Sequence, residues 1–114
     1  MSFLSTIFGH KNEASDKIVV LDKIDYAAAI YDKKVQLVDV RTANEFNGGH
    51  IKGAKNIDFF NAANFEVSFS KFDKTKPVYV YCRSGARSQK AAKKLVDMGF
   101  SQIFDLKGGY SRWS

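Results

Sequence analysis

The sequence predicts an α/β domain whose mainly parallel central sheet has about five strands and carries helices on both faces. Short apolar and β-branched segments, typical of strands, alternate with segments that have the helical period. This alternation indicates strand–helix–strand units, which build parallel sheets. Two of the strand segments, 35–40 and 78–81, are almost entirely apolar, as expected for strands buried on both faces.

Hydrophobic period and capping residues assign the individual segments. The predicted strands cover residues 17–21, 35–40, 54–57, 78–81 and 102–106. The predicted helices cover residues 22–31, 42–46 and 88–98. Asp22 and Thr42 are typical N-terminal caps, and Glu45 can complete a capping box with Thr42. Gly99 is typical of a helix end, and the aromatic segment 58–76 is expected to form a helix and a loop over the sheet.

The chain has 114 residues, which fits one domain. We assign residues 16–114 to that domain and residues 1–15 to an N-terminal segment, expected to be a short helix docked on it. Four apolar residues of this segment share one helical face: Phe3, Leu4, Ile7 and Phe8. A weak membrane or partner anchor is the alternative, disfavoured because no Lys or Arg precedes Lys11. No other apolar stripe is expected to be exposed, and no stretch is long enough to span a membrane.

The net charge of +6 and the isoelectric point near 9.5 suit two classes of partner, nucleic acids and small anions. The sequence contains none of the motifs of nucleic-acid-binding proteins. The positive charges also gather around one loop, described below. We therefore expect a small anionic substrate and no nucleic acid.

The chain has a single cysteine, Cys82. It has no partner for an internal disulfide and no internal thiol to resolve an oxidised state. A lone thiol without a secretory signal is typical of the reducing cytoplasm, where we expect the protein to be. The two histidines, His10 and His50, are too far apart for a structural zinc site, so we expect no metal and no cofactor.

Cys82 lies between the predicted strand 78–81 and the helix 88–98, at the sheet edge where α/β proteins place their active sites. A lone cysteine is more often buried and inert. Here, however, small residues in the following turn let backbone amides converge on one point, and the helix adds its positive end. Two arginines add charge, which favours a thiolate and binds anions. We predict that Cys82 is catalytic and that the substrate-binding residues are Arg83, Ser84, Gly85, Ala86 and Arg87.

Four residues separate Cys82 from Arg87. Cysteine phosphatases and related arsenate reductases resemble this arrangement but have five residues between the cysteine and the arginine. The shorter cradle suits one sulfur atom on Cys82 better than a transferring phosphoryl group. Phosphatase or arsenate reductase chemistry remains an alternative.

Four motifs in order resemble those of the rhodanese family, over about residues 16–114. They are Asp39-Val-Arg41, Glu45-Phe46 with Gly49-His50-Ile51, Gly53-Ala54 and Asn56-Ile57, the loop Cys82–Arg87, and Gly108-Gly109 with Trp113. The sequence departs from the family at Lys52 and Asp58, where proline is frequent, and at Gly48, which loosens the turn before His50. None of these departures touches the Cys82 loop.

The resemblance implies a single-domain sulfurtransferase. In this family the cysteine at the position of Cys82 attacks the outer sulfur of thiosulfate or another sulfane donor and keeps it as a persulfide. Cyanide or a thiol then takes the sulfur. The implied partners are thus a small anionic donor, a thiol or cyanide acceptor, and a thiol-reductant or sulfur-acceptor protein. A non-catalytic interaction module on the same fold is the other open alternative.

Three further residues are predicted to support the site. Asp39 and Arg41 follow a buried strand and are expected to form a polar link that braces neighbouring loops, with Glu45 as a candidate partner for Arg41. Ser88 begins the helix after the loop. His50 is expected to be structural, because sulfur transfer to a preformed thiolate needs no general base.

Overall fold

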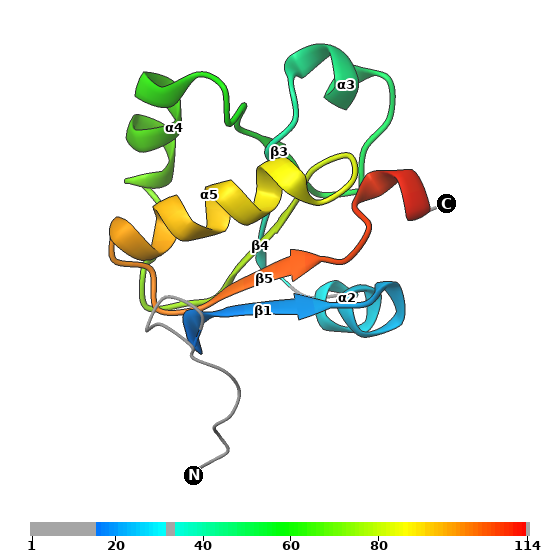
Figure 1. The fold of residues 1–114 in the computed structure, drawn as a ribbon, viewed down its shortest axis with the longest axis horizontal. Coiled ribbons are helices and arrows are strands. Elements are labelled where there is room, and N and C mark those ends of the chain that lie inside the picture. Colours follow the sequence, from blue (N-terminus) through cyan, green and yellow to red (C-terminus); the bar gives the residue numbers. More distant parts are fainter. Residues whose placement is uncertain (1–15, 32–33, 114) are drawn as a thin grey trace, which may run out of the picture.

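Five parallel strands form one sheet in the order β1-β5-β4-β2-β3 (Figure 1). The structure is a computed structural model that describes residues 16–31 and 34–113. The strands are β1 (Ile18–Leu21), β2 (Gln36–Asp39), β3 (Lys55–Asn56), β4 (Val78–Tyr81) and β5 (Ile103–Leu106). The parallel sheet of five strands is therefore confirmed; β4 has the predicted bounds, and the other four strands are one or two residues shorter than predicted. The N-terminal helix expected within residues 1–15 lies outside the described residues.

Helices lie on both faces of this sheet, as predicted. They are α2 (Lys23–Ile30), α3 (Ala43–Asn47), α4 (Ala62–Phe69), α5 (Ala86–Asp97) and the 3-10 helix η1 (Tyr110–Arg112). Figure 1 shows α2 on one side of the sheet and α4 and α5 on the other. It also shows α3, the N-terminal end of α5 and η1 at the same end of the sheet. That end is the carboxyl edge of the strands, where the active loop was expected.

The hydrophobic core is split by the sheet into two clusters. In β4, Val78 and Val80 belong to the cluster under α4 and α5, whereas Tyr79 and Tyr81 belong to the cluster on the side of α2. This alternation follows from the two-residue period of a strand. All four residues are buried, so β4 is anchored on both faces and holds Cys82 in a defined position at its end.

Capping residues set the helix starts. The predicted capping box is confirmed: the Glu45 amide donates to Thr42 Oγ1 at 3.3 Å, and the Thr42 amide donates to Glu45 Oε1 at 3.0 Å. Helix α5, however, begins two residues earlier than predicted, because Gly85 with φ of 116° forms the cap. Arg87 therefore lies in the first helical turn and not in the preceding loop.

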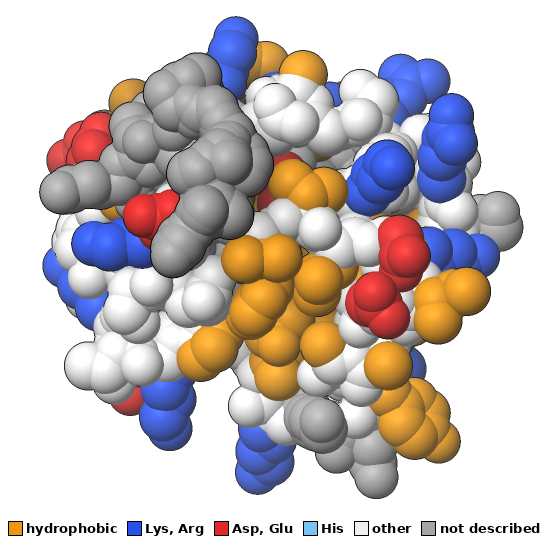
Figure 2. Space-filling model, turned by 60° about the horizontal axis from the view of Figure 1, so that its bottom comes forward, with side chains coloured by type: hydrophobic (Ala, Val, Ile, Leu, Met, Phe, Trp, Pro, Cys, Tyr) orange, Lys and Arg blue, Asp and Glu red, His pale blue; other side chains and the backbone are white. Residues whose placement is uncertain are grey.

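Hydrophobic side chains gather on the face shown in Figure 2. Val20 of the edge strand β1 is 50% exposed, and Ile24 of α2 is 79% exposed. The expectation that no apolar stripe is exposed outside the N-terminal segment is therefore not met on this face. The reason is that, among the described residues, β1 has a neighbouring strand on one side only, and that α2 is short, with Tyr26 as its one buried side chain. None of the helices in the described part of the chain is long and apolar enough to cross a membrane.

Candidate active site

Cys82 follows β4 directly and is only 1% exposed. The Gly85 amide donates a hydrogen bond to Cys82 Sγ at 3.0 Å. On its other side the thiol donates to Ser88 Oγ at 3.4 Å, and the Ser88 hydroxyl donates to the Gly85 carbonyl at 3.1 Å. The sulfur thus lies inside the turn that joins β4 to α5, held by polar groups of the same turn.

The N-terminus of α5 faces this sulfur. Gly85 has no side chain to cap the helix, and the first amides of a helix have no partner within it. The positive φ of Gly85 is a conformation that residues with a side chain rarely adopt. Because free amides and the helix dipole favour negative charge, the turn suits a thiolate or an anionic sulfur.

Arg87 is held by Glu45 of α3. Its two terminal nitrogens donate to Glu45 Oε1 at 2.7 Å and to Oε2 at 2.9 Å. Hydrogen bonding to Arg87 lowers the pKa of Glu45 to about 2. The Arg87 guanidinium also lies 5.5 Å from the ring centroid of the exposed Phe60. Glu45 was expected to pair with Arg41, so this pairing corrects that prediction.

Arg83 and Ser84 lie on the exposed, outer side of the turn. Ser84 borders a hollow of about 610 Å³ whose other lining residues are Asp22, Lys23, Lys107, Gly108, Ser111 and Arg112. Three of these residues are cationic. The hollow beside the Cys82 turn therefore offers positive charge to a small anion.

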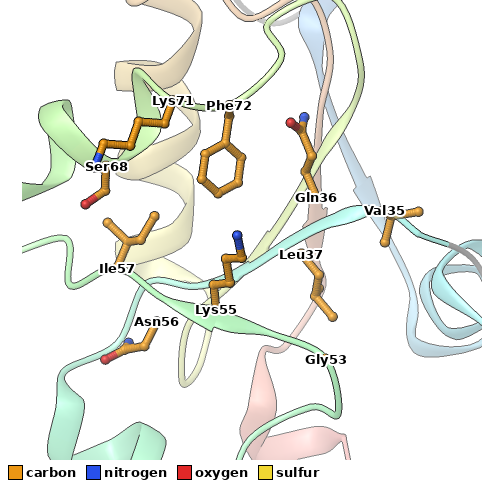
Figure 3. A pocket seen from close by; sticks show the side chains of 10 residues that line it. All are labelled: Val35, Gln36, Leu37, Gly53, Lys55, Asn56, Ile57, Ser68, Lys71 and Phe72. Carbon is orange, nitrogen blue, oxygen red and sulfur yellow. The ribbon is translucent and has the colours of Figure 1, made fainter.

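A second pocket, of about 430 Å³, lies beside β3 and the end of α4 (Figure 3). Figure 3 shows Lys55 of β3 pointing toward Phe72, and its Nζ lies 5.7 Å from the centroid of that ring. None of the residues that line this pocket belongs to the Cys82 turn. Of these two pockets, the one that borders the Cys82 turn is therefore the hollow beside Ser84.

Asp39 and Arg41 form a buried ion pair at the end of β2. Arg41 Nη2 lies 2.6 Å from Asp39 Oδ2, and the two side chains are 5% and 0% exposed. The same nitrogen donates to the Gly49 carbonyl at 2.7 Å, and the guanidinium lies 4.5 Å from the ring centroid of Tyr110. The pair thus links the end of β2 to the turn before His50 and to η1.

Gly109 lets the segment that leads into η1 pack directly against the Cys82 turn. The Tyr110 amide donates to the Cys82 carbonyl at 2.8 Å, and the Ser111 amide donates to the Arg83 carbonyl at 2.9 Å. A Cβ on Gly109 would lie 2.5 Å from the carbonyl carbon and oxygen of Arg83. Only glycine allows the two segments to approach so closely.

Comparison with known proteins identifies the family of the chain. The model of the rhodanese-like domain matches residues 22–114. The chain belongs to the rhodanese-like family. The Cys82 turn of this rhodanese-like domain is the loop that resembled the family's active loop in sequence.

Relatives of the rhodanese-like domain include a named enzyme. The chain is 43% identical over 81 residues to the thiosulfate sulfurtransferase GlpE of Shewanella oneidensis, and the match covers 71% of this chain and 77% of GlpE. It is also 43% identical over 81 residues to the uncharacterized protein YqhL of Bacillus subtilis, again over 71% of this chain. The matched part of this chain spans 62% of YqhL, which is less than two thirds of the length of YqhL. These relationships support sulfurtransferase activity in general.

A solved structure agrees with this assignment. A rhodanese-like domain protein from Staphylococcus aureus superposes with a TM-score of 0.73 at 28% identity. The match covers 84% of this chain and 91% of that protein.

Two features of the rhodanese-like domain were not predicted from sequence: the pairing of Glu45 and the buried Asp105. The role of Glu45 at the active turn was missed because its partner, Arg87, is 42 residues away in sequence. Asp105 of β5 was also missed. It is 1% exposed and lies in the apolar segment Ile-Phe-Asp-Leu, where an inward-facing acid is a signal that could have been read.

His50 hydrogen-bonds through Nδ1 to the Phe46 carbonyl at 2.9 Å and stacks on the Phe46 ring.

Proposed function

We propose that the protein is a sulfurtransferase that carries a sulfane sulfur on Cys82 as a persulfide. The observation that carries this proposal is the 3.0 Å hydrogen bond from the Gly85 amide to the buried Cys82 Sγ, at the N-terminus of α5. A donor to sulfur at this position favours the thiolate, which is the nucleophile in sulfur chemistry. The similarity to a thiosulfate sulfurtransferase supports thiosulfate or a related sulfane compound as donor.

The first step is a displacement at the outer sulfur of the donor. The Cys82 thiolate attacks that sulfur, a new S–S bond forms, and the S–S bond of thiosulfate breaks. Sulfite leaves with the electron pair, and a persulfide anion remains on Cys82. The first-turn amides of α5 are free to bind its negative outer sulfur, as oxyanion-hole amides bind developing charge.

The second step returns the cysteine to its starting state. Cyanide or a thiolate attacks the outer sulfur, the S–S bond to Cys82 breaks, and the Cys82 thiolate leaves. Thiocyanate or a new persulfide is the product. Splitting the transfer into two displacements through a covalent intermediate replaces one difficult step with two easier ones.

The surrounding residues hold the turn in place for both steps. Arg87 contributes positive charge near Cys82, and its ion pair with Glu45 fixes the turn to α3. The hollow beside Ser84 attracts the anionic donor through its cationic lining. Asp39 and Arg41 act at a distance by bracing the neighbouring loops. Gly85 and Ala86 contribute backbone amides, and Arg83 contributes charge at the outer rim.

We further propose that the domain comprises residues 16–114 and acts in the cytoplasm. Because the chain has a single cysteine, the persulfide has no internal thiol to discharge it. Discharge therefore needs an external acceptor. The candidates are cyanide, a small thiol, or a thiol-reductant or sulfur-acceptor protein.

Intact-mass measurement after incubation with thiosulfate tests the proposal. The expected result is the addition of one sulfur atom to the wild type and none to Cys82→Ser, with release of that sulfur as thiocyanate on addition of cyanide. A wild type that takes no sulfur from thiosulfate or from other sulfane donors would contradict persulfide chemistry. It would favour the interaction-module alternative. Hydrolysis of an aryl phosphate, lost in Cys82→Ser, would instead favour the phosphatase alternative.

A further inference from the structure

The pocket beside β3 is not used in the two steps above, and the sheet explains why it is open (Figure 3). Strand β3 has two residues, and its ladder with β2 begins at the pair Val38–Lys55. Gln36 and Leu37, at the start of β2, therefore have no strand of the described chain beside them on that side. Both residues line the pocket of about 430 Å³, a volume typical of sites for small molecules.

The backbone amide of Leu37 faces this pocket. Asp39, two residues further along β2, faces the side of β3, because its carbonyl accepts from the Ile57 amide at 3.0 Å. Backbone groups two residues apart in a strand face the same neighbour, so the Leu37 amide faces the side of β3 as well. The ladder with β3 begins only after Leu37, so this amide has no strand partner among the described residues. Leu37 is only 5% exposed, and a buried backbone donor of this kind is satisfied by an acceptor on a ligand.

The charged side chains of the pocket are both positive. Figure 3 shows Lys55 pointing into the pocket between Phe72 and Gln36, and its Nζ lies 5.7 Å from the centroid of the Phe72 ring. The exposed Lys71 also lines the pocket. None of the lining residues is acidic, and neither lysine forms an ion pair within the described part of the chain. The pocket therefore offers hydrogen-bond donors and positive charge, which suit an anion.

The amide side chains in the pocket wall are held by the backbone. Gln36 Nε2 donates to the Asp73 carbonyl at 3.1 Å, and Gln36 Oε1 accepts from the Asp73 amide at 2.8 Å. Asn56 Nδ2 donates to the carbonyls of Asp39 and Arg41, at 3.0 and 2.8 Å. These contacts fix the wall before any ligand arrives, so little side-chain freedom is lost on binding.

Apolar side chains complete the lining. Ile57 is 5% exposed, and the half-buried Phe72 packs against the same core cluster. We propose that this pocket is a second binding site, for a small monocarboxylate that carries an apolar ring. The carboxylate accepts from the Leu37 amide and lies against Lys55, whose single inward charge matches it, while the ring packs on Phe72 and leaves water. None of the lining residues belongs to the Cys82 turn, so this site is independent of the proposed function.

The first test is an NMR titration of the backbone amides with three ligands. Phenylacetate has both ring and charge, phenylacetamide has only the ring, and acetate has only the charge. Phenylacetate should shift the amides of Leu37, Gly53 and Phe72 saturably, with a dissociation constant in the millimolar range that is usual for a ligand of this size. Phenylacetamide and acetate should bind about tenfold more weakly or worse. Equal binding of phenylacetate and phenylacetamide, or shifts confined to residues 82–88, would overturn the proposed site.

The second test removes the inward charge. Lys55→Met keeps an unbranched apolar side chain, so phenylacetamide should bind as it does to the wild type. Phenylacetate should bind about tenfold more weakly or worse, because a hydrogen bond to a charged group is lost. Lys90→Met, on the exposed face of α5, is the matched control and should bind phenylacetate as the wild type does. An unchanged affinity of Lys55→Met for phenylacetate would contradict the role assigned to Lys55 and overturn the proposal.

Discussion

The carboxylate of Glu45 accepts hydrogen bonds from both terminal nitrogens of Arg87, which links α3 to the first turn of α5. The two side chains are 25% and 19% exposed, so water partly screens the pair. Its stabilising effect on the whole fold is therefore modest, about 1 kcal/mol or less. Its effect on the position of the Cys82 turn is larger, because a bidentate contact fixes both distance and orientation.

Glu45→Gln is expected to slow sulfur loading more than it destabilises the fold. The amide can accept from only one arginine nitrogen, so the turn gains freedom, and misplacement of reacting groups costs roughly tenfold to a hundredfold in rate. Single-turnover loading from thiosulfate and urea unfolding measure the two effects. Glu66→Gln is the matched control, since Glu66 is 65% exposed and its oxygen lies 3.6 Å from Lys94. Equal rates for the two variants would contradict the positioning role.

The contribution of the Glu45–Arg87 pair to the unfolding free energy should persist at moderately acidic pH. Because the pKa of Glu45 is lowered to about 2, its contribution to stability is fully present above the unfolded-state value of about 4.3. That contribution is lost as pH falls from about 4 toward 2. The difference in unfolding free energy between the wild type and Glu45→Gln should therefore be constant from neutral pH to about pH 5 and then shrink. A difference that already shrinks between pH 7 and 5 would refute the assigned pKa direction.

Gly109→Ala should impair the active turn by direct contact. The new Cβ would meet the Arg83 carbonyl group at 2.5 Å, so the turn or η1 must move. Gly53→Ala is the control: Gly53 also has a positive φ, 89°, but nothing lies within 4 Å of a Cβ there. Both variants carry backbone strain of about 1–3 kcal/mol, and only Gly109→Ala should lose sulfur loading. Equal loading rates would show that the turn does not depend on this close approach.

Arg41→Met should be the most destabilising of these changes. It leaves the fully buried Asp39 carboxylate without its cation, and breaking such a pair costs about 3–5 kcal/mol. Adding Asp39→Asn removes the uncompensated charge and should recover a large part of the loss. Urea unfolding measures all three proteins, with Lys90→Met on the exposed face of α5 as a control. A double variant no more stable than Arg41→Met would argue against an electrostatic origin.

Charge reversal at the hollow beside Ser84 should weaken donor capture. Lys107→Glu is expected to raise the KM for thiosulfate while leaving kcat nearly unchanged, because Lys107 attracts the donor and does not contact the reacting sulfur. The effect should diminish with added salt, since screening is strong beyond about 8 Å at physiological ionic strength. Lys93→Glu, on the exposed face of α5, is the matched control. A salt-independent change in KM would point to a structural cause.

The parts of the molecule that were predictable from sequence are those governed by local pattern. The buried run of β4, the capping box at Thr42 and the glycine at the end of α5 each follow from neighbouring residues. The start of α5 was misplaced because Gly85 caps the helix through its backbone conformation and offers no side-chain signal.

Contacts between distant segments were harder to predict. Two acids, Asp39 and Glu45, are near Arg41 in sequence. Only the fold shows that Arg41 pairs with Asp39, whereas Glu45 pairs with Arg87. The support of the Cys82 turn by Tyr110 and Ser111 likewise depends on how the chain returns to the sheet edge. Local sequence carries little information about such encounters.

The depth of Cys82 has a consequence for the choice of acceptor. With the residue 1% exposed, a persulfide extends its outer sulfur only one S–S bond, about 2 Å, toward the surface. We therefore expect a thiol on a narrow loop, on a flexible tail or in a small molecule to reach it more easily than a thiol on a flat protein face. For the same reason we expect no disulfide between two copies of this protein. We therefore expect the Cys82 turn to select acceptors by whether their thiol can reach the outer sulfur, independently of their reactivity.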